Sequence, residues 1–215
     1  EEADRTGQSV YEGLYHFFRA YHFFNLTLKF GDIPYSEALK GEKEAMFTPK
    51  YDSQEEVFAG ILDELQQSSE LLAAAADKEE IISGDIIYGG SSAKWQRLVN
   101  SFRLKVLMTL SHKSNVGNHD IKKDFATIVS QPLIESNSDN GQLSYIDQEG
   151  NRYPQFNAQW SGFYMDKTFI DRLSERRDPR LFLYALPTNE AASAGKSADD
   201  FTAYAGGDPT VPYGE

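Results

Sequence analysis

The chain has 215 residues, of which 40% are hydrophobic and 25% are charged, and its formal net charge is −12. This composition is that of a globular protein with room for a substantial core. The acidic charge argues against nucleic acid or an anionic membrane surface as a partner, because both need basic patches. The absence of cysteine excludes disulfides, thiolate metal sites and cysteine nucleophiles. No run approaches the roughly 20 apolar residues that a membrane-spanning helix needs.

Amphipathic helix patterns dominate the first part of the chain. The first pattern runs from about Ser9 to Phe30, where apolar residues recur at spacings of three and four. Its apolar stripe is broad and aromatic, which predicts neighbours on more than one side. Gly31 is expected to end the helix, because glycine tolerates a left-handed backbone. Pro34 then keeps the chain extended, because it lacks an amide hydrogen.

Two further long helices are predicted. One begins after Ser53, which can form a capping box with Glu56. A glycine-containing break at 83–90 separates it from a helix over about Ala93–Ser111, which is apolar on two faces and therefore expected to be buried. Trp95 lies in the main stripe of that helix and is expected in the core. The exposed side of the earlier helix is expected to carry its carboxylates, at Glu55, Glu56, Asp63, Glu64 and Glu70.

The later part of the chain has a different composition and weaker helix patterns. A weaker helix over about Ile121–Ser130 is stopped by Pro132. From Asn137 to Asn157, small polar residues alternate with isolated aromatics, and 148–151 is predicted to be a turn between two short extended pieces. One more helix is predicted over about Lys167–Arg177. The segment after Pro187 is predicted to be loop.

Together these elements predict a mostly α fold with tetratricopeptide-like helix pairs, a loop-rich segment and minor β structure. Residues 1–135 are expected to form a helical-repeat portion. Residues 136–215 are expected to form a loop-rich portion with one or two helices. The chain has no signal peptide and no initiator methionine. Both ends resemble cuts through a longer protein, so we expect an incomplete part of a single domain.

No catalytic or metal-binding pattern emerges from the sequence. The polar run 137–141 lacks the ligand spacing and the terminal glutamate of a calcium loop. The 33 carboxylates could supply the pair that a glycosidase needs, but sequence does not show which of them converge. We therefore expect no metal and no cofactor. The histidines also lack the i, i+4 spacing of a helical zinc site: His16, His22, His112 and His119.

Aromatic residues outside helical periodicity are the candidate ligand-binding residues. Sugar rings present apolar C–H faces that stack on Trp and Tyr, while amide and carboxylate groups bind their hydroxyls. The segment 153–164 combines both kinds of side chain. The alternative for each ring is that it pins a long loop onto the helical core. The candidates are Tyr145, Tyr153, Asn157, Trp160 and Tyr164.

A series of short motifs occurs in an order typical of one protein family. They are GDIPYSEA at 31–38, YDSQEEVF at 51–58 with ILDEL at 61–65, YGG at 88–90, KW at 94–95, NSFRLK at 100–105, RDPRL at 177–181 and YAGGD at 204–208. Together they resemble the SusD/RagB-like outer-membrane nutrient-binding lipoproteins of Bacteroidetes. The similarity is greatest to the SusD-like branch with a W-x-x-x-x-N-S-x-R-L-like third helix.

The resemblance implies a cell-surface lipoprotein without enzyme activity, built on tetratricopeptide-like helix pairs. Such a protein would partner a SusC-like TonB-dependent transporter in the outer membrane and capture oligosaccharide, or peptide in some branches, for import. Its only membrane contact would be a lipid anchor outside this chain. A helical-repeat scaffold for peptide or protein partners is the alternative function, and a glycosidase is a distant third.

Overall fold

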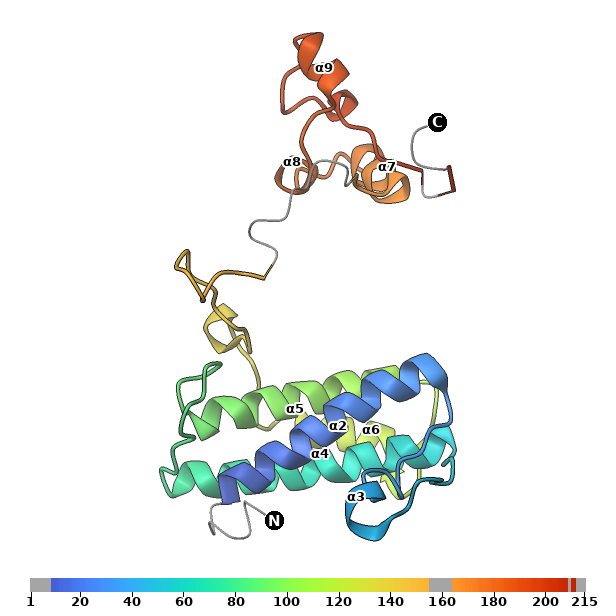
Figure 1. Ribbon diagram of the computed structural model, residues 1–215, viewed down its shortest axis with the longest axis vertical. Helices are drawn as coiled ribbons and strands as arrows, with labels where there is room; N and C mark the ends of the chain where they lie inside the picture. The colour runs from blue at the N-terminus through green and yellow to red at the C-terminus, as the bar shows by residue number, and fades with distance from the viewer. Residues whose placement is uncertain (1–8, 155–163, 209, 212–215) are drawn as a thin grey trace. The chain divides into compact units, whose positions relative to one another are not determined.

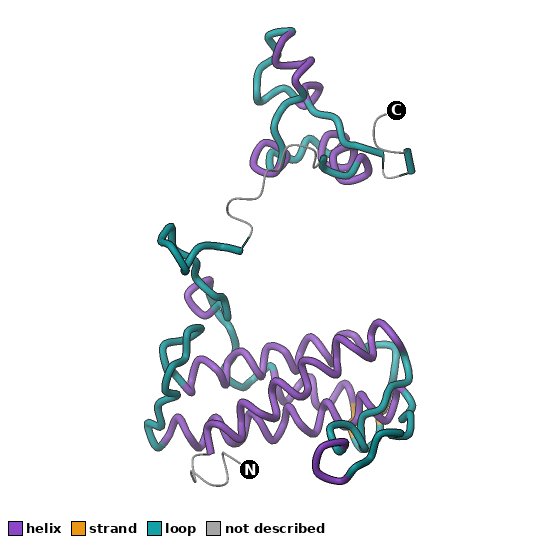
Figure 2. Tube along the Cα trace, viewed as in Figure 1, coloured by secondary structure: helices purple, strands orange, loops and turns teal. Residues whose placement is uncertain are grey.

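The computed structural model divides the chain into two compact units, Glu1–Tyr145 and Ile146–Glu215 (Figures 1 and 2). The structure describes residues 9–154, 164–208 and 210–211. None of the described helices is both long enough and apolar enough to cross a membrane.

The long helices of the first unit form two antiparallel pairs that share α4 (Figure 1). Near the start of α2, the Ser9 hydroxyl donates to Glu80, just beyond the end of α4 (3.2 Å). In the middle of the other pair, Ser69 on α4 donates to Asn100 on α5 (2.7 Å). This arrangement confirms the predicted mostly α, tetratricopeptide-like fold. The three helices are α2 (Ser9–Phe30), α4 (Gln54–Asp77) and α5 (Ser92–Thr109).

The core of the first unit is aromatic. Phe24 from α2 is 2% exposed and meets Phe58 and Phe102 edge to face, with ring centroids 6.1 and 5.2 Å apart. Phe17 and Trp95 make a similar contact at 5.8 Å, and edge-to-face geometry is favourable for aromatic pairs. Both the burial of Trp95 and the presence of neighbours on two sides of α2 were expected, and both are confirmed.

The predicted helix boundaries are close to the observed ones. Ser53 and Glu56 form the predicted capping box, in which the Ser53 amide donates to the Glu56 carboxylate (2.8 Å). Gly31 adopts a φ of +74°, in the left-handed region expected for the residue that ends α2. The short α3 (Gly41–Glu44) has no buried residue and lacks an apolar stripe, so no sequence pattern predicted it.

The minor β structure lies elsewhere than predicted. Strands β1 (Asn115–Val116) and β2 (His119–Asp120) form a small hairpin in which Val116 faces His119, and both residues are buried. The predicted turn at 148–151 is present, since Asn151 donates to the Gln148 carbonyl (2.9 Å). Its described flanks do not form strands, because residues 141–152 are exposed and have no core to cover. Helix α6 (Ile121–Ile128) follows the hairpin, and the short η1 (Asn137–Asp139) comes after it.

The second unit consists of short helices around a small core. The predicted helix over about Lys167–Arg177 is confirmed as α7 (Lys167–Glu175). The prediction of loop after Pro187 is wrong in part, because Thr188 caps a short helix by accepting a hydrogen bond from the Ala191 amide (3.1 Å). The remaining elements are α8 (Leu181–Tyr184), α9 (Asn189–Ser193) and η2 (Phe201–Ala203).

Candidate functional site

The motif at 31–38 forms a loop that is fixed to the start of α4. Ile33 pairs with Asp52 in an antiparallel bridge. The buried Asp52 carboxylate accepts hydrogen bonds from the amides of Tyr35 (3.0 Å) and Ser36 (2.7 Å). Burial alone would raise the pKa of Asp52, but these bonds and the nearby Lys50 outweigh it and lower the pKa to about 2. The motif residues therefore hold the loop in place.

Glu64 departs from its predicted exposed position, because its side chain is only 16% exposed and lies in a polar cluster. Arg19 on α2 contacts Glu64 through Nε (2.8 Å) and donates to the Tyr35 carbonyl (3.0 Å). His16 also contacts the Glu64 carboxylate. Burial, followed by the charge of Glu64, raises the pKa of Tyr35 to about 12. This cluster ties α2, α4 and the loop together.

Asp85 organises the glycine-containing break before α5 in the same way. Its carboxylate accepts hydrogen bonds from the amides of Ile87 (2.9 Å) and Gly90 (3.0 Å) and from the indole of Trp95 (2.9 Å). Burial opposes ionisation of Asp85, but these donors hold its pKa below the usual value. Asp85 thus joins the turn of the YGG motif to Trp95 of the KW motif on α5.

The YAGGD motif of the second unit requires close backbone packing. Gly207 forms a parallel bridge with Asp166, and its amide donates to the Met165 carbonyl (2.8 Å). A Cβ on Gly206 would lie 2.5 Å from the Cα of Lys167, so only glycine fits there. In the RDPRL motif, Asp178 accepts hydrogen bonds from Arg180, which lower its pKa to about 2.

The predicted ligand-binding residues are distributed over both units. Tyr145 belongs to the first unit and is 46% exposed, whereas Tyr153 (49%) and Tyr164 (74%) belong to the second. Asn157 and Trp160 lie outside the described residues. Tyr164 precedes the Asp166–Gly207 bridge, and a Cβ on Gly207 would be 3.3 Å from the Cβ of Tyr164. The structure therefore presents the described tyrosines as partly exposed rings on loops.

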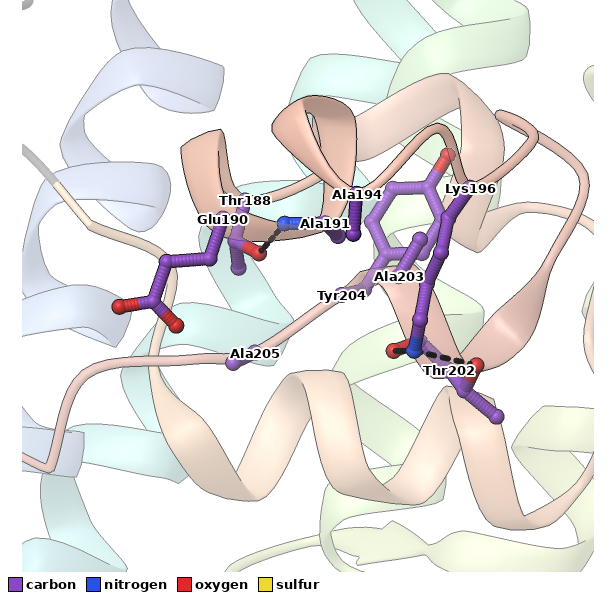
Figure 3. A pocket seen from close by; sticks show the side chains of 9 residues that line it. All are labelled: Thr188, Glu190, Ala191, Ala194, Lys196, Thr202, Ala203, Tyr204 and Ala205. Atoms are coloured by element: carbon purple, nitrogen blue, oxygen red, sulfur yellow. Dashed lines mark hydrogen bonds between the residues drawn. The ribbon is translucent and has the colours of Figure 1, made fainter.

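A pocket of about 390 Å³ lies in the second unit (Figure 3). The Lys196 ammonium donates to the hydroxyl and the carbonyl of Thr202, both at 2.9 Å. Tyr204 contributes its ring and donates its hydroxyl to the Ala198 carbonyl (2.5 Å). Figure 3 shows that the Glu190 side chain is directed away from Lys196. The pocket thus offers a ring, hydroxyls and single charges of both signs.

Sequence reasoning missed most of this pocket. Tyr204 was part of a family motif, but its place beside a cavity depends on contacts between η2 and α9. Thr188 followed by a short run of helix-forming residues was a local signal for the cap that begins α9. Among the described residues that line the pocket, Glu190 is the one carboxylate, so they do not supply the paired carboxylates of a glycosidase. Among the described residues, none form a group of three or more potential ligands for a metal ion.

The fold and the pockets define a tetratricopeptide-like helical protein with small polar cavities. The chain belongs to the SusD-like family described as starch-binding and associating with the outer membrane, whose family model matches residues 1–209. This confirms the resemblance found in the sequence. The family consists of binding proteins associated with the outer membrane. This is the location that the resemblance predicted.

Solved structures of similar proteins show the same fold. A SusD homologue from Bacteroides fragilis NCTC 9343 is 58% identical with a TM-score of 0.90, and the match covers 100% of this chain and 46% of that chain. An outer membrane protein from Bacteroides vulgatus ATCC 8482, with a suggested part in nutrient binding, is 52% identical with a TM-score of 0.86 (95% and 45% covered). A second Bacteroides fragilis SusD homologue is 38% identical with a TM-score of 0.83 (95% and 43% covered).

The chain therefore spans less than half the length of these three structures. Among curated proteins, none matches the chain.

Proposed function

We propose that the protein is a non-catalytic cell-surface protein that captures a nutrient, an oligosaccharide, for import by a SusC-like TonB-dependent transporter. The observation that carries the proposal is the family match over residues 1–209, since the family is described as starch-binding and associating with the outer membrane. The chain is proposed to be an incomplete part of a single SusD-like domain, because the similar structures are more than twice as long.

The second unit supplies chemistry suited to a sugar. Exposed tyrosine rings can stack on the C–H face of a sugar, and the polar groups around Tyr204 can bind hydroxyls. The proposed ligand-binding residues remain Tyr145, Tyr153, Asn157, Trp160 and Tyr164. A shallow site of this kind buries little area, so we expect dissociation constants on the order of micromolar to millimolar.

Calorimetric titration of the chain with maltoheptaose tests this proposal. We expect saturable heat without hydrolysis, and about tenfold weaker binding by the variants Tyr164→Ala and Trp160→Ala, because each removes a stacking ring. Tyr51→Ala is the matched control, since Tyr51 is 72% exposed and is not among the proposed ligand-binding residues. Hydrolysis of the sugar, or binding unaffected by either variant, would contradict the proposal. Co-purification of the full-length protein with an outer-membrane transporter tests the partner separately.

A scaffold for a peptide or protein is the second candidate function. It is favoured by an apolar surface along α2, where Phe18 (44%), Tyr21 (42%) and Leu28 (49%) remain partly exposed. If the protein is a scaffold, replacing Phe18 and Tyr21 together by serine would abolish association with the partner. The same double variant would leave maltoheptaose binding unchanged if the sugar proposal holds.

A further inference from the structure

A second pocket, of about 260 Å³, lies in the first unit between α4, α5 and α6. Its lining includes the buried Ser69 and Ile128. Glu70 on α4 and Asp124 on α6 bring two carboxylates to the pocket, and Arg103 on α5 brings a guanidinium. All of these residues belong to one compact unit, so the pocket does not depend on how the two units are arranged.

Arg103 is the unusual member of this pocket. Its Nε donor is buried and finds no hydrogen-bond partner among the described residues. An unsatisfied buried donor is unfavourable by about 1–3 kcal/mol, and native proteins rarely leave one without an acceptor. Burial lowers the pKa of Arg103, while the charges of Asp124 and Glu70 act in the opposite direction. The guanidinium stays charged, and its Nε–H is enclosed without an acceptor among the described residues, so the remaining N–H groups are those that a molecule in the pocket can meet.

Further hydrogen bonds hold the Asp124 and Glu70 carboxylates in position beside Arg103. His119 contacts the Asp124 carboxylate through Nδ1 (2.9 Å) and Asp63 through Nε2 (3.0 Å). Gln66 donates to the Glu70 carboxylate (3.0 Å). Such support fixes the direction of a binding group before a ligand arrives, which lowers the entropic cost of binding.

The mixture of charges selects the class of ligand. Two carboxylates and one guanidinium give the pocket a formal charge of −1, so an anion that paired with Arg103 would be repelled by Glu70 and Asp124. A neutral polyol can bind the guanidinium without being repelled by the carboxylates, because each of its hydroxyls can donate a hydrogen bond to a carboxylate and accept one from the guanidinium. We propose that this pocket binds one neutral sugar ring through hydrogen bonds to Arg103, Glu70 and Asp124. The proposal rests on the proposed function in taking a saccharide as the ligand.

The test uses the ¹⁵N-labelled chain and maltose as the probe. We expect a saturable shift of the Arg103 Nε–H resonance in NMR spectra, because the sugar binds the guanidinium that carries this N–H group. Arg103→Met, which keeps the length of the side chain but removes its donors, should weaken maltose binding by about tenfold or more. Arg97→Met is the matched control, since Arg97 is on the same helix but pairs with Asp139 outside the pocket. It should bind maltose like the wild type.

Glu70→Gln provides a second variant if Arg103→Met does not fold, because Glu70 is exposed at the pocket. It should bind maltose severalfold more weakly. Three results would each overturn the inference: maltose binding that is unchanged in both variants, a shift produced by inorganic phosphate instead of maltose, or hydrolysis of a nitrophenyl glucoside by the two carboxylates.

The outcomes also separate this inference from the proposed function. Maltoheptaose binding that is lost in Tyr164→Ala but kept in Arg103→Met would retain the proposed function and overturn the pocket. The reverse result would retain the pocket and contradict the proposed stacking site.

Discussion

The first unit buries three long helices against one another, whereas the second unit joins helices of four to nine residues by turns. In the first unit, large aromatic rings such as Phe24 and Trp95 fill the space between helices. The second unit has a much smaller core around Ile170 and Leu181. Local hydrogen bonds must therefore contribute a larger share of the stability of the second unit, because its small core removes less apolar area from water.

Both units nevertheless contain aspartates whose carboxylates accept hydrogen bonds from backbone amides. Asp52 and Asp85 fix loops in the first unit, and Asp178 and Asp208 do so in the second. Asp52 is buried and both Asp85 and Asp178 are half-buried, whereas Asp208 is exposed. The same kind of contact should therefore contribute most to stability at Asp52 and least at Asp208, because solvent weakens exposed charge interactions.

The largest effect is expected from Phe24→Ala in the core of the first unit. Removing this ring should lower the free energy of unfolding by about 3–5 kcal/mol, because it leaves a cavity among Phe58 and Phe102. Urea denaturation of both proteins in a Trp160→Phe background, followed by Trp95 fluorescence, measures the loss. Phe18→Ala is the control, and a loss of about 3 kcal/mol or more there would show that the exposed ring contributes as much as the core.

Asp85→Ala tests the contribution of the enclosed carboxylate. The variant leaves the Trp95 indole and the Ile87 and Gly90 amides without their acceptor, so we expect a loss of about 2–4 kcal/mol. Denaturation monitored by the same fluorescence measures it. Asp77→Ala, at the exposed end of α4, should change stability by less than about 0.5 kcal/mol. Equal effects of the two substitutions would contradict the role of Asp85.

Gly206→Ala addresses backbone packing in the second unit. The added Cβ would meet the Cα of Lys167 at 2.5 Å and push apart the Asp166–Gly207 bridge, with an expected loss of about 1–3 kcal/mol. Hydrogen exchange with mass spectrometry should show faster exchange over residues 164–208 only. Faster exchange in α4 as well would mean that the two units unfold together.

The smallest effect is expected for the loss of stability at low pH. Asp52 and Asp178 both have a pKa of about 2 in the folded chain, below the unfolded value of about 3.9. Their contribution to stability is therefore full above about pH 4 and lost as the pH falls towards 2. Urea midpoints at pH 7 and pH 2.5 should differ less in Asp52→Asn than in the wild type. Asp178→Asn should reduce that difference by a smaller amount, because the Asp178 side chain is 19% exposed, whereas Asp52 is 4% exposed.

Much of the fold was predictable from local patterns. The bounds of α2 and the capping box of α4 follow from apolar spacing and from the chemistry of Ser53 and Glu56. The β1–β2 hairpin was missed, because two-residue strands carry no alternation and depend on the burial of Val116. Helix α9 was missed because it is short and its cap at Thr188 is a weak signal.

The candidate sites were less accessible to sequence reasoning. Exposed aromatic residues such as Tyr153 and Tyr164 could be selected by composition. The pocket beside Tyr204 and the one beside Arg103 could not be selected, because their lining residues come from separate elements. Glu64 shows the same limit, since helical spacing predicted it on the surface and a partner on α2 partly buries it.

By itself, the sequence determined the family, the long helices and the turns that aspartates and glycines require. These features depend on neighbours a few residues away, so spacing and residue type carry them. Only the tertiary structure decided which carboxylates are enclosed, where cavities lie and that the Arg103 Nε finds no partner in the described part of the chain. Those properties depend on distances between residues far apart in the chain, such as Glu70, Arg103 and Asp124, which packing alone brings together.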